Sequence, residues 1–180
     1  MTPLTTADSR SPRGNMQFAK DSFYAALRDR LAALEPARTI VVGGRMRPAV
    51  LVDENEPANS APPLPNAFHL AWGIPETVKG AEAARRPLMK IDCTIAYRIA
   101  GAQPGAVDRG RALTALDAEL LRLTAPPRTP KCDQTHVPPV DLGSTVFWGF
   151  PEFGAVESAH DELRRQARLA VFFFSEVDQA

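Results

Sequence analysis

Cys132 and His136, in the stretch PKCDQTHVPP, have the residue types and the spacing of two ligands of a metal site. A thiolate sulfur and an imidazole nitrogen can both coordinate zinc. A structural zinc site needs two further ligands, and the other candidates show no paired spacing: His69, His160, Cys93 and the carboxylates. We therefore expect no metal site and no bound cofactor, and the pair is the best support for the alternative of a small-molecule-binding or metal-binding module.

Ser158, His160 and Asp161 are the residue types of a hydrolase triad. Neighbours in the sequence do not point at one another as a nucleophile, a base and an orienting acid must, and the chain has no G-x-S-x-G turn. A serine followed by carboxylates is typical of a helix start, where the hydroxyl caps the helix and the acids face its positive end. We expect no catalytic residue and no enzymatic activity.

The stretch VVGGRMRP follows an apolar run, as a phosphate-binding turn would. It lacks the G-x-x-x-x-G-K spacing and a third glycine, and a strand-like run follows it in place of a helix. A hairpin turn at Gly43 and Gly44 is the favoured interpretation. Trp72 and Trp148 could line a cleft, but aromatic residues beside strands are more often core or interface anchors.

Composition excludes several classes of function. The chain has 180 residues and 44% hydrophobic residues, enough for one globular core. Its 21 basic and 21 acidic side chains leave no net field to hold a polyanion, so we expect no nucleic-acid specificity. No apolar run is long enough to span a membrane, and MTPLTTADSRSPRGN has no apolar core of a signal peptide, so we expect a cytoplasmic location.

Proline-rich stretches divide the chain. We expect a flexible N-terminal tail over residues 1–15 and a single domain over 16–180. Within that domain, 56–66 and 124–143 are predicted to be proline-rich loops. The second is long for a compact domain, so we interpret it as an arm that orders against a partner.

Apolar periodicity predicts two helices. In residues 16–35 the apolar side chains recur every three to five positions, and Pro36 ends the pattern; they are Phe18, Phe23, Leu27, Leu31 and Leu34. Residues 105–124 show a second stripe, which Pro126 and Pro127 end; it consists of Val107, Leu113, Leu116, Leu120 and Leu123.

The clearest strand is LMKIDCTIAYRIA, residues 88–100, where apolar residues alternate strictly with polar ones. Weaker strands are expected at 67–73, at 144–149 and from about Arg165 to 177, after a helix-like start at 160. The order of these elements predicts an α+β fold, an antiparallel β-sheet with the two main helices packed on one face.

The order of elements in this chain resembles that of the tail terminator, or tail completion, proteins of long-tailed bacteriophages. The elements are the helix AALRDRLAAL, a short strand, a GR.RPAV strand followed by acidic residues, a long alternating strand, the helix ALTALDAELLRL and an apolar final strand. The GR.RPAV strand and its acids are Gly44, Arg45, Pro48, Ala49, Val50, Asp53 and Glu54. The resemblance covers residues 18–56, 88–123 and 165–177. The tail, the 56–66 loop and the 124–143 arm depart from the family pattern.

The resemblance implies a non-enzymatic structural protein with an α+β fold. Such proteins form a hexameric ring on the head-proximal end of the tail tube, stop its growth and offer a surface for head joining. The implied partners are copies of the same chain and other tail or neck proteins, and the implied location is the host cytoplasm during assembly and then the virion tail. A head-tail connector or neck component of a phage-like machine is the nearest alternative.

LAVFFFSEV, residues 169–177, predicts the interface of such an assembly. Alternation places Phe172 and Phe174 on the sheet face of Lys90, Asp92 and Arg98, opposite the face of Leu169, Val171 and Phe173. Two phenylalanines on a polar face indicate a covered patch. Either loops of the same chain or a neighbouring subunit would cover it.

Overall fold

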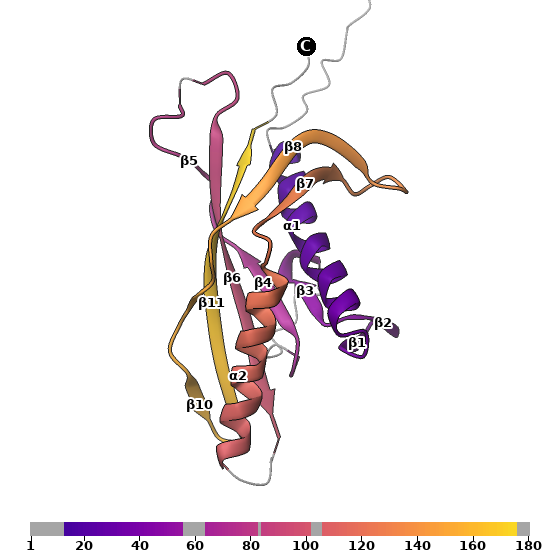
Figure 1. The fold of residues 1–180 in the computed structure, drawn as a ribbon, viewed down its shortest axis with the longest axis vertical. Coiled ribbons are helices and arrows are strands. Elements are labelled where there is room, and N and C mark those ends of the chain that lie inside the picture. Colours follow the sequence, from indigo (N-terminus) through magenta and orange to yellow (C-terminus); the bar gives the residue numbers. More distant parts are fainter. Residues whose placement is uncertain (1–12, 56–63, 83, 102–105, 176–180) are drawn as a thin grey trace, which may run out of the picture.

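A computed structural model describes residues 13–55, 64–82, 84–101 and 106–175. One mixed sheet of nine strands forms the framework, and both helices, α1 (Arg13–Leu34) and α2 (Ala106–Leu123), lie on one side of it (Figure 1). The predicted class is therefore confirmed in outline. The sheet is larger than predicted and only mostly antiparallel, because β3 (Val50–Val52) and β4 (Phe68–Trp72) run parallel.

Two long strands, β6 (Leu88–Ala100) and β11 (Glu162–Phe174), form the centre of this sheet. They pair antiparallel along their whole length, from Glu162 beside Ala100 to Phe174 beside Leu88. The alternation in residues 88–100 correctly predicted β6. The final strand begins at Glu162 rather than Arg165 because its first residues continue the ladder with β6.

Shorter strands extend the sheet on both sides in the order β3-β4-β6-β11-β8-β7. Beside β6 lies β5 (Glu76–Thr77), and beside β11 lie β9 (Glu152–Phe153) and β10 (Glu157–Ala159). The helix-like start expected at 160 is wrong. Ser158 belongs to β10, and His160 lies in the tight turn to β11 with a φ of 50°.

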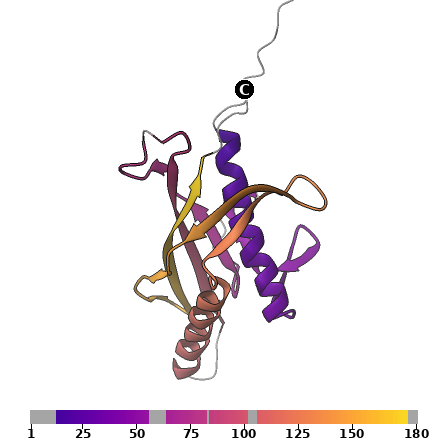
Figure 2. The ribbon, with the colours of Figure 1, turned by 45° about the horizontal axis from the view of Figure 1, so that its top comes forward.

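The segment 124–143 contains a β-hairpin where a loop was expected. It supplies β7 (Arg128–Asp133) and the beginning of β8 (Val140–Trp148), which pair antiparallel with a bulge after Pro130. Its prolines hid the strand from periodicity, since Pro is unusual inside a sheet. The hairpin bends over α1 (Figures 1 and 2), where the amide of Cys132 donates a hydrogen bond to Ser22 Oγ at 2.9 Å.

A second, two-stranded sheet stands apart from the first. It consists of β1 (Thr39–Val42) and β2 (Arg45–Pro48), joined by Gly43 and Gly44 with φ of 56° and 75°. Such backbone angles favour glycine and produce a two-residue hairpin turn. The hairpin turn was predicted correctly, but the strand that pairs is RMRP, while the following apolar run becomes β3 of the main sheet.

The hydrophobic core lies between the helices and the sheet. Most of its helical side chains belong to the predicted stripes; they include Phe23, Leu27, Leu31, Leu113, Leu116, Leu120 and Leu123. Of the other predicted residues, Leu34 is exposed, Phe18 is half-buried outside the core, and the side chain of Val107 is not among those described. The sheet contributes the predicted apolar sets, among them Ile91, Cys93, Ile95, Leu169, Val171 and Phe173.

The expected tail at 1–15 and the 56–66 loop lie mostly outside the described residues, and α1 begins at Arg13.

Candidate functional site: the open face of the sheet

The sheet face opposite the helices carries the predicted interface residues. Register confirms that Phe172 lies beside Lys90 and that Ala170 lies beside Asp92, so Phe172, Lys90 and Asp92 share one face. Phe173, between the two outward phenylalanines, is fully buried in the core, whereas Phe174 is 43% exposed. We call this outward face of β6 and β11 the open face.

An aromatic cluster forms one end of the open face. The rings of Phe172 and Phe147 stack with centroids 5.4 Å apart and planes 13° apart. Phe147 comes from β8, which pairs with β11 at this point. The chain thus covers part of Phe172 with its own strand, and Phe174 stays exposed beside it.

Next to the aromatic cluster the open face carries a ladder of ion pairs. Lys90 Nζ lies 3.1 Å from a carboxylate oxygen of Glu76 and 3.3 Å from one of Asp92. Arg168 pairs with the other oxygen of Asp92. The hydrogen bonds to Glu76 and then Asp92 raise the pKa of Lys90. These charges neutralise one another and leave a polar surface of little net charge.

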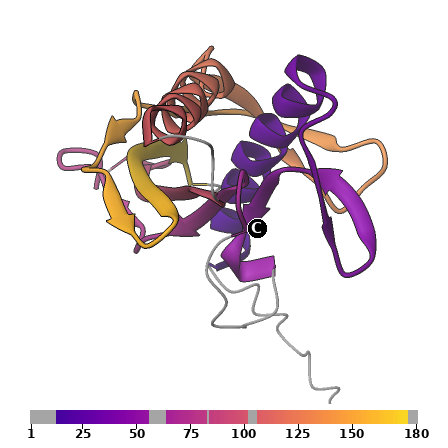
Figure 3. The same cartoon turned by 90° about the horizontal axis from the view of Figure 1, so that it is seen from below.

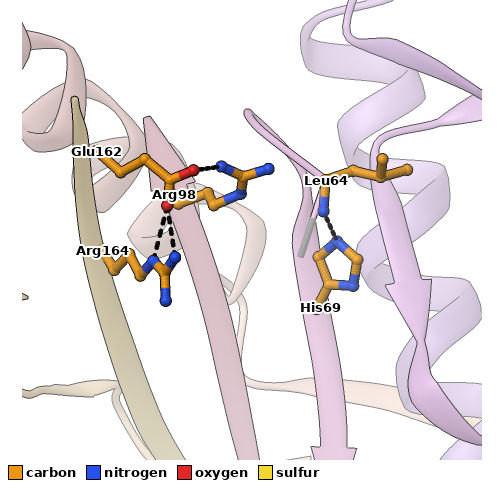
Figure 4. A network of polar contacts seen from close by, with 5 residues as sticks. All are labelled: Leu64, His69, Arg98, Glu162 and Arg164. Atoms are coloured by element: carbon orange, nitrogen blue, oxygen red, sulfur yellow. Dashed lines mark hydrogen bonds and ion pairs between the residues drawn. The ribbon is translucent and has the colours of Figure 1, made fainter. Parts of the chain in front are cut away.

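Arg98 lies at the other end of the open face, in a second polar cluster (Figure 4). It is buried and pairs with Glu162, which also binds Arg164 at 2.6 Å. Hydrogen bonding from Arg164, together with the charge of Arg98, lowers the pKa of Glu162. His69 Nε2 accepts a hydrogen bond from the Leu64 amide at 2.9 Å on the neighbouring strand.

The five predicted interface residues therefore do not form one patch. Arg98 lies eight positions along β6 from Lys90, which corresponds to roughly 27 Å at the usual rise of a strand. Phe172, Phe174, Lys90 and Asp92 lie together at the aromatic end. Arg98 is bound into the other cluster, where it stabilises the end of the sheet.

A repeated motif, which periodicity did not detect, frames the open face. Residues 72–76 read WGIPE and residues 148–152 read WGFPE. Each follows one flank of the central strands and contains one residue more than the strand opposite, a β-bulge. The amide of Gly73 donates to Asp92 O at 2.8 Å, and the amide of Gly149 donates to Ala170 O at 3.0 Å.

The two motifs are related by an approximate two-fold rotation through the Asp92–Ala170 pair. Trp72 lies beside Cys93 and Trp148 beside Val171, each one residue after a member of that pair. On the helix side both tryptophans meet Phe23 edge to face, with ring centroids 5.6 and 4.9 Å away. Comparing the sequence with itself would have found this repeat.

The bulges also expose large apolar side chains. Ile74 is 90% exposed and Phe150 is 80% exposed, each directly before the motif's proline. The glutamates that follow lie beside basic residues of the central strands, Glu76 beside Lys90 and Glu152 beside Arg168. Both margins of the open face therefore offer one exposed apolar group. Glu76 forms an ion pair with Lys90 on one margin. On the other margin Glu152 lies beside Arg168, whose ion pair is with Asp92.

The candidate chemical groups are placed as follows. Trp148 is buried and its indole donates to Thr124 O at 2.9 Å, so the tryptophans pack against α1 and do not line a cleft. His136 Nδ1 lies 3.2 Å from Asp133, near Cys132. Over the described residues, no group of three or more His, Cys, Asp or Glu is arranged to hold a metal. Nor does any helix in the described ranges have the length and apolarity to cross a membrane.

Buried titratable groups stabilise α2 on the sheet. Asp117 accepts hydrogen bonds from Tyr97 Oη, at 2.5 Å, and from Arg165. Burial and the bond to Asp117 raise the pKa of Tyr97, and burial raises the pKa of Cys93. Both groups are therefore neutral near pH 7, and the bonds of Tyr97 and Arg165 to Asp117 tie α2 to the sheet.

No protein-family model and no curated protein matches this chain. Among the solved structures to which the chain is similar are two with the following values. One, whose description states no function, is 15% identical with a TM-score of 0.44 over 91% of this chain and 98% of its own. The other, from the virion of a native gene transfer agent particle, is 18% identical with a TM-score of 0.39 over 93% of this chain and 100% of its own. At such scores the likeness carries no functional argument.

Proposed function

We propose that this protein is a non-enzymatic assembly protein of a phage or prophage tail, of the tail-terminator type, which caps the tail tube and joins it to the head. The observation that carries the proposal is the open face. Both helices lie on one side of the sheet, so no described helix covers the other side of its thirteen-residue strands. Exposed Phe174, Ile74 and Phe150 lie on or beside that face. Apolar groups of this kind suit a protein–protein contact.

The order of elements supports the same function. The segments that resemble tail terminator proteins form α1, the GR.RPAV hairpin leading into β3, the long β6, α2 and the final strand β11. These elements build the core and the open face together. In the proposed assembly the subunits form a ring, and each uses two unlike surfaces for its two neighbours.

Electron microscopy of the purified protein mixed with tail tubes tests the proposal. We expect rings, and tubes with one end closed by added density. The tubes are an essential component, because capping is recognised by added density at their ends. A protein that neither forms rings nor binds tube ends would contradict the proposed function.

Two alternatives make different predictions. A head-tail connector or neck component would bind purified necks or portals and leave free tube ends bare. A metal-binding module would retain a stoichiometric metal at Cys132 and His136, which elemental analysis of untagged protein would detect. The arrangement of Asp133 beside His136 does not favour that module over the assembly role.

A further inference from the structure

Two exposed surfaces of opposite charge lie on opposite sides of the molecule. One is the β1–β2 hairpin, residues 36–48, with three arginines and no carboxylate. The other is the margin segment, residues 150–162, with four carboxylates and no lysine or arginine. Figures 1 and 3 show the hairpin and β10, a strand of the main sheet, on opposite sides of the molecule. The hairpin of one molecule therefore cannot contact the margin segment of the same molecule.

The hairpin presents two exposed apolar groups on one face and, on the other face near its turn, a cation that forms no ion pair with a described residue. Val41 and Met46 are cross-strand neighbours and are 62% and 73% exposed. Arg45 follows the glycine turn, is exposed, and makes no ion pair with any described residue. By contrast, Arg38 at the base of the hairpin is bound to Glu119 at 2.9 Å.

The margin segment presents the complementary groups. Phe150 and Val156 are exposed apolar side chains. Glu152, Glu157 and Asp161 are exposed, and within the described ranges none of them forms an ion pair. Since β10 pairs only with β11, its outer backbone edge has no partner among the described strands. An edge with exposed carboxylates can receive a basic hairpin.

We infer that the β1–β2 hairpin of one copy docks on the margin segment of the next copy, head to tail. The hairpin carries an exposed cation, the margin segment carries exposed carboxylates, and both surfaces expose apolar side chains. Such complementarity fixes the orientation of a contact and excludes wrong ones. A contact between unlike surfaces closes into a ring or continues as a filament. This inference rests on the proposed assembly role and names the surfaces that the subunits would use.

Charge reversal tests the contact. Arg45→Glu and Glu157→Arg should each weaken self-association at least ten-fold in sedimentation velocity, because like charges would then face one another. An equimolar mixture of the two variants should recover association, since each altered hairpin then meets an altered margin segment. Arg86→Glu, a reversal at an exposed residue of the β5–β6 loop, serves as the matched control and should change nothing. Circular dichroism melting would show that all variants fold.

The outcomes separate the two proposals. A wild-type protein that self-associates regardless of these reversals, or in which the mixture shows no recovery, overturns the hairpin contact and leaves the assembly role standing. A wild-type protein that stays monomeric up to about 100 µM, a weak affinity for a protein contact, also overturns the contact between free copies. Association that follows the charge pattern while tube ends stay bare supports the contact and contradicts the tail-capping role.

Discussion

Phe23 is the residue on which both halves of the sheet converge. It is fully buried on α1, and its ring contacts Trp72 of the WGIPE motif and Trp148 of the WGFPE motif edge to face. Edge-to-face pairs of this kind add to the free energy of burial. A single side chain thus connects the N-terminal helix to both flanks of the sheet.

Phe23→Ala should lower the free energy of unfolding by about 3–5 kcal/mol, the usual cost of removing a buried phenylalanine. Urea denaturation followed by tryptophan fluorescence would measure it, and both tryptophans should report the change. Phe23→Leu keeps much of the volume and should cost less. Equal losses for the two variants would contradict a packing role for the ring.

Glu162 should make stability depend on acidification. Its folded-state pKa lies below the ordinary value of 4.5, because Arg164 and Arg98 stabilise the carboxylate. A lowered pKa contributes stability that is present above the unfolded value and is lost as pH falls through the folded value. Glu162→Gln should therefore be less stable than wild type at pH 7, and the difference should shrink below about pH 4.5. Urea midpoints from pH 7 to 3 would show this, and a constant difference would contradict it.

Among the elements, β11 has two faces with different tasks. Its odd-numbered residues from Ala167 to Phe173 pack against the helices, and its even-numbered residues face outward. Three consecutive phenylalanines therefore meet two environments. Phe173 belongs to the core, Phe172 stacks on Phe147 in the aromatic cluster, and Phe174 stays exposed on the open face.

The double variant Phe172→Ser and Phe174→Ser should fold and should fail to assemble. We expect a loss of unfolding free energy of about 1–2 kcal/mol from the broken stack with Phe147, and fewer capped tubes in electron micrographs. Phe173→Ser is the matched control on the other face, and it should unfold the protein because it removes core volume and buries a hydroxyl. A double variant as unstable as Phe173→Ser would show that both faces are internal core.

The whole molecule is neutral because separated charges cancel. The 21 basic and 21 acidic residues are distributed so that the hairpin is basic and the margin segment is acidic. The open face between them is neutral through internal ion pairs. Net charge therefore conceals a polarity that would orient neighbouring subunits.

Self-association through this polarity should weaken with salt. Raising the ionic strength from about 0.1 to 1 M shortens the Debye length from about 10 to 3 Å, which screens exposed charges. Sedimentation at several salt concentrations would measure the dissociation constant. An association that strengthens steadily with salt would indicate an apolar contact, of the kind the aromatic cluster could make.

Local periodicity was sufficient for the elements whose environment repeats along the chain. The alternation of residues 88–100 predicted both faces of β6, and the apolar stripes predicted both helices, because each of these segments has one dry side and one wetter side. The same alternation correctly assigned Phe172 and Phe174 to the face of Lys90 and Asp92. The separation of Arg98 from them follows from strand rise alone.

Only the tertiary structure decided which strands pair. Three features depend on contacts between distant parts of the chain: the parallel β3–β4 pair, the β7–β8 hairpin over α1, and the contact of both tryptophans with Phe23. In residues 124–143 the prolines also interrupt the alternation by which a strand is predicted. The basic residues of the hairpin and the acidic residues of the margin segment can be counted in the sequence. Their placement on opposite sides of the molecule depends on the fold. Pairing between distant segments is set by the shared core, which no short window of sequence contains.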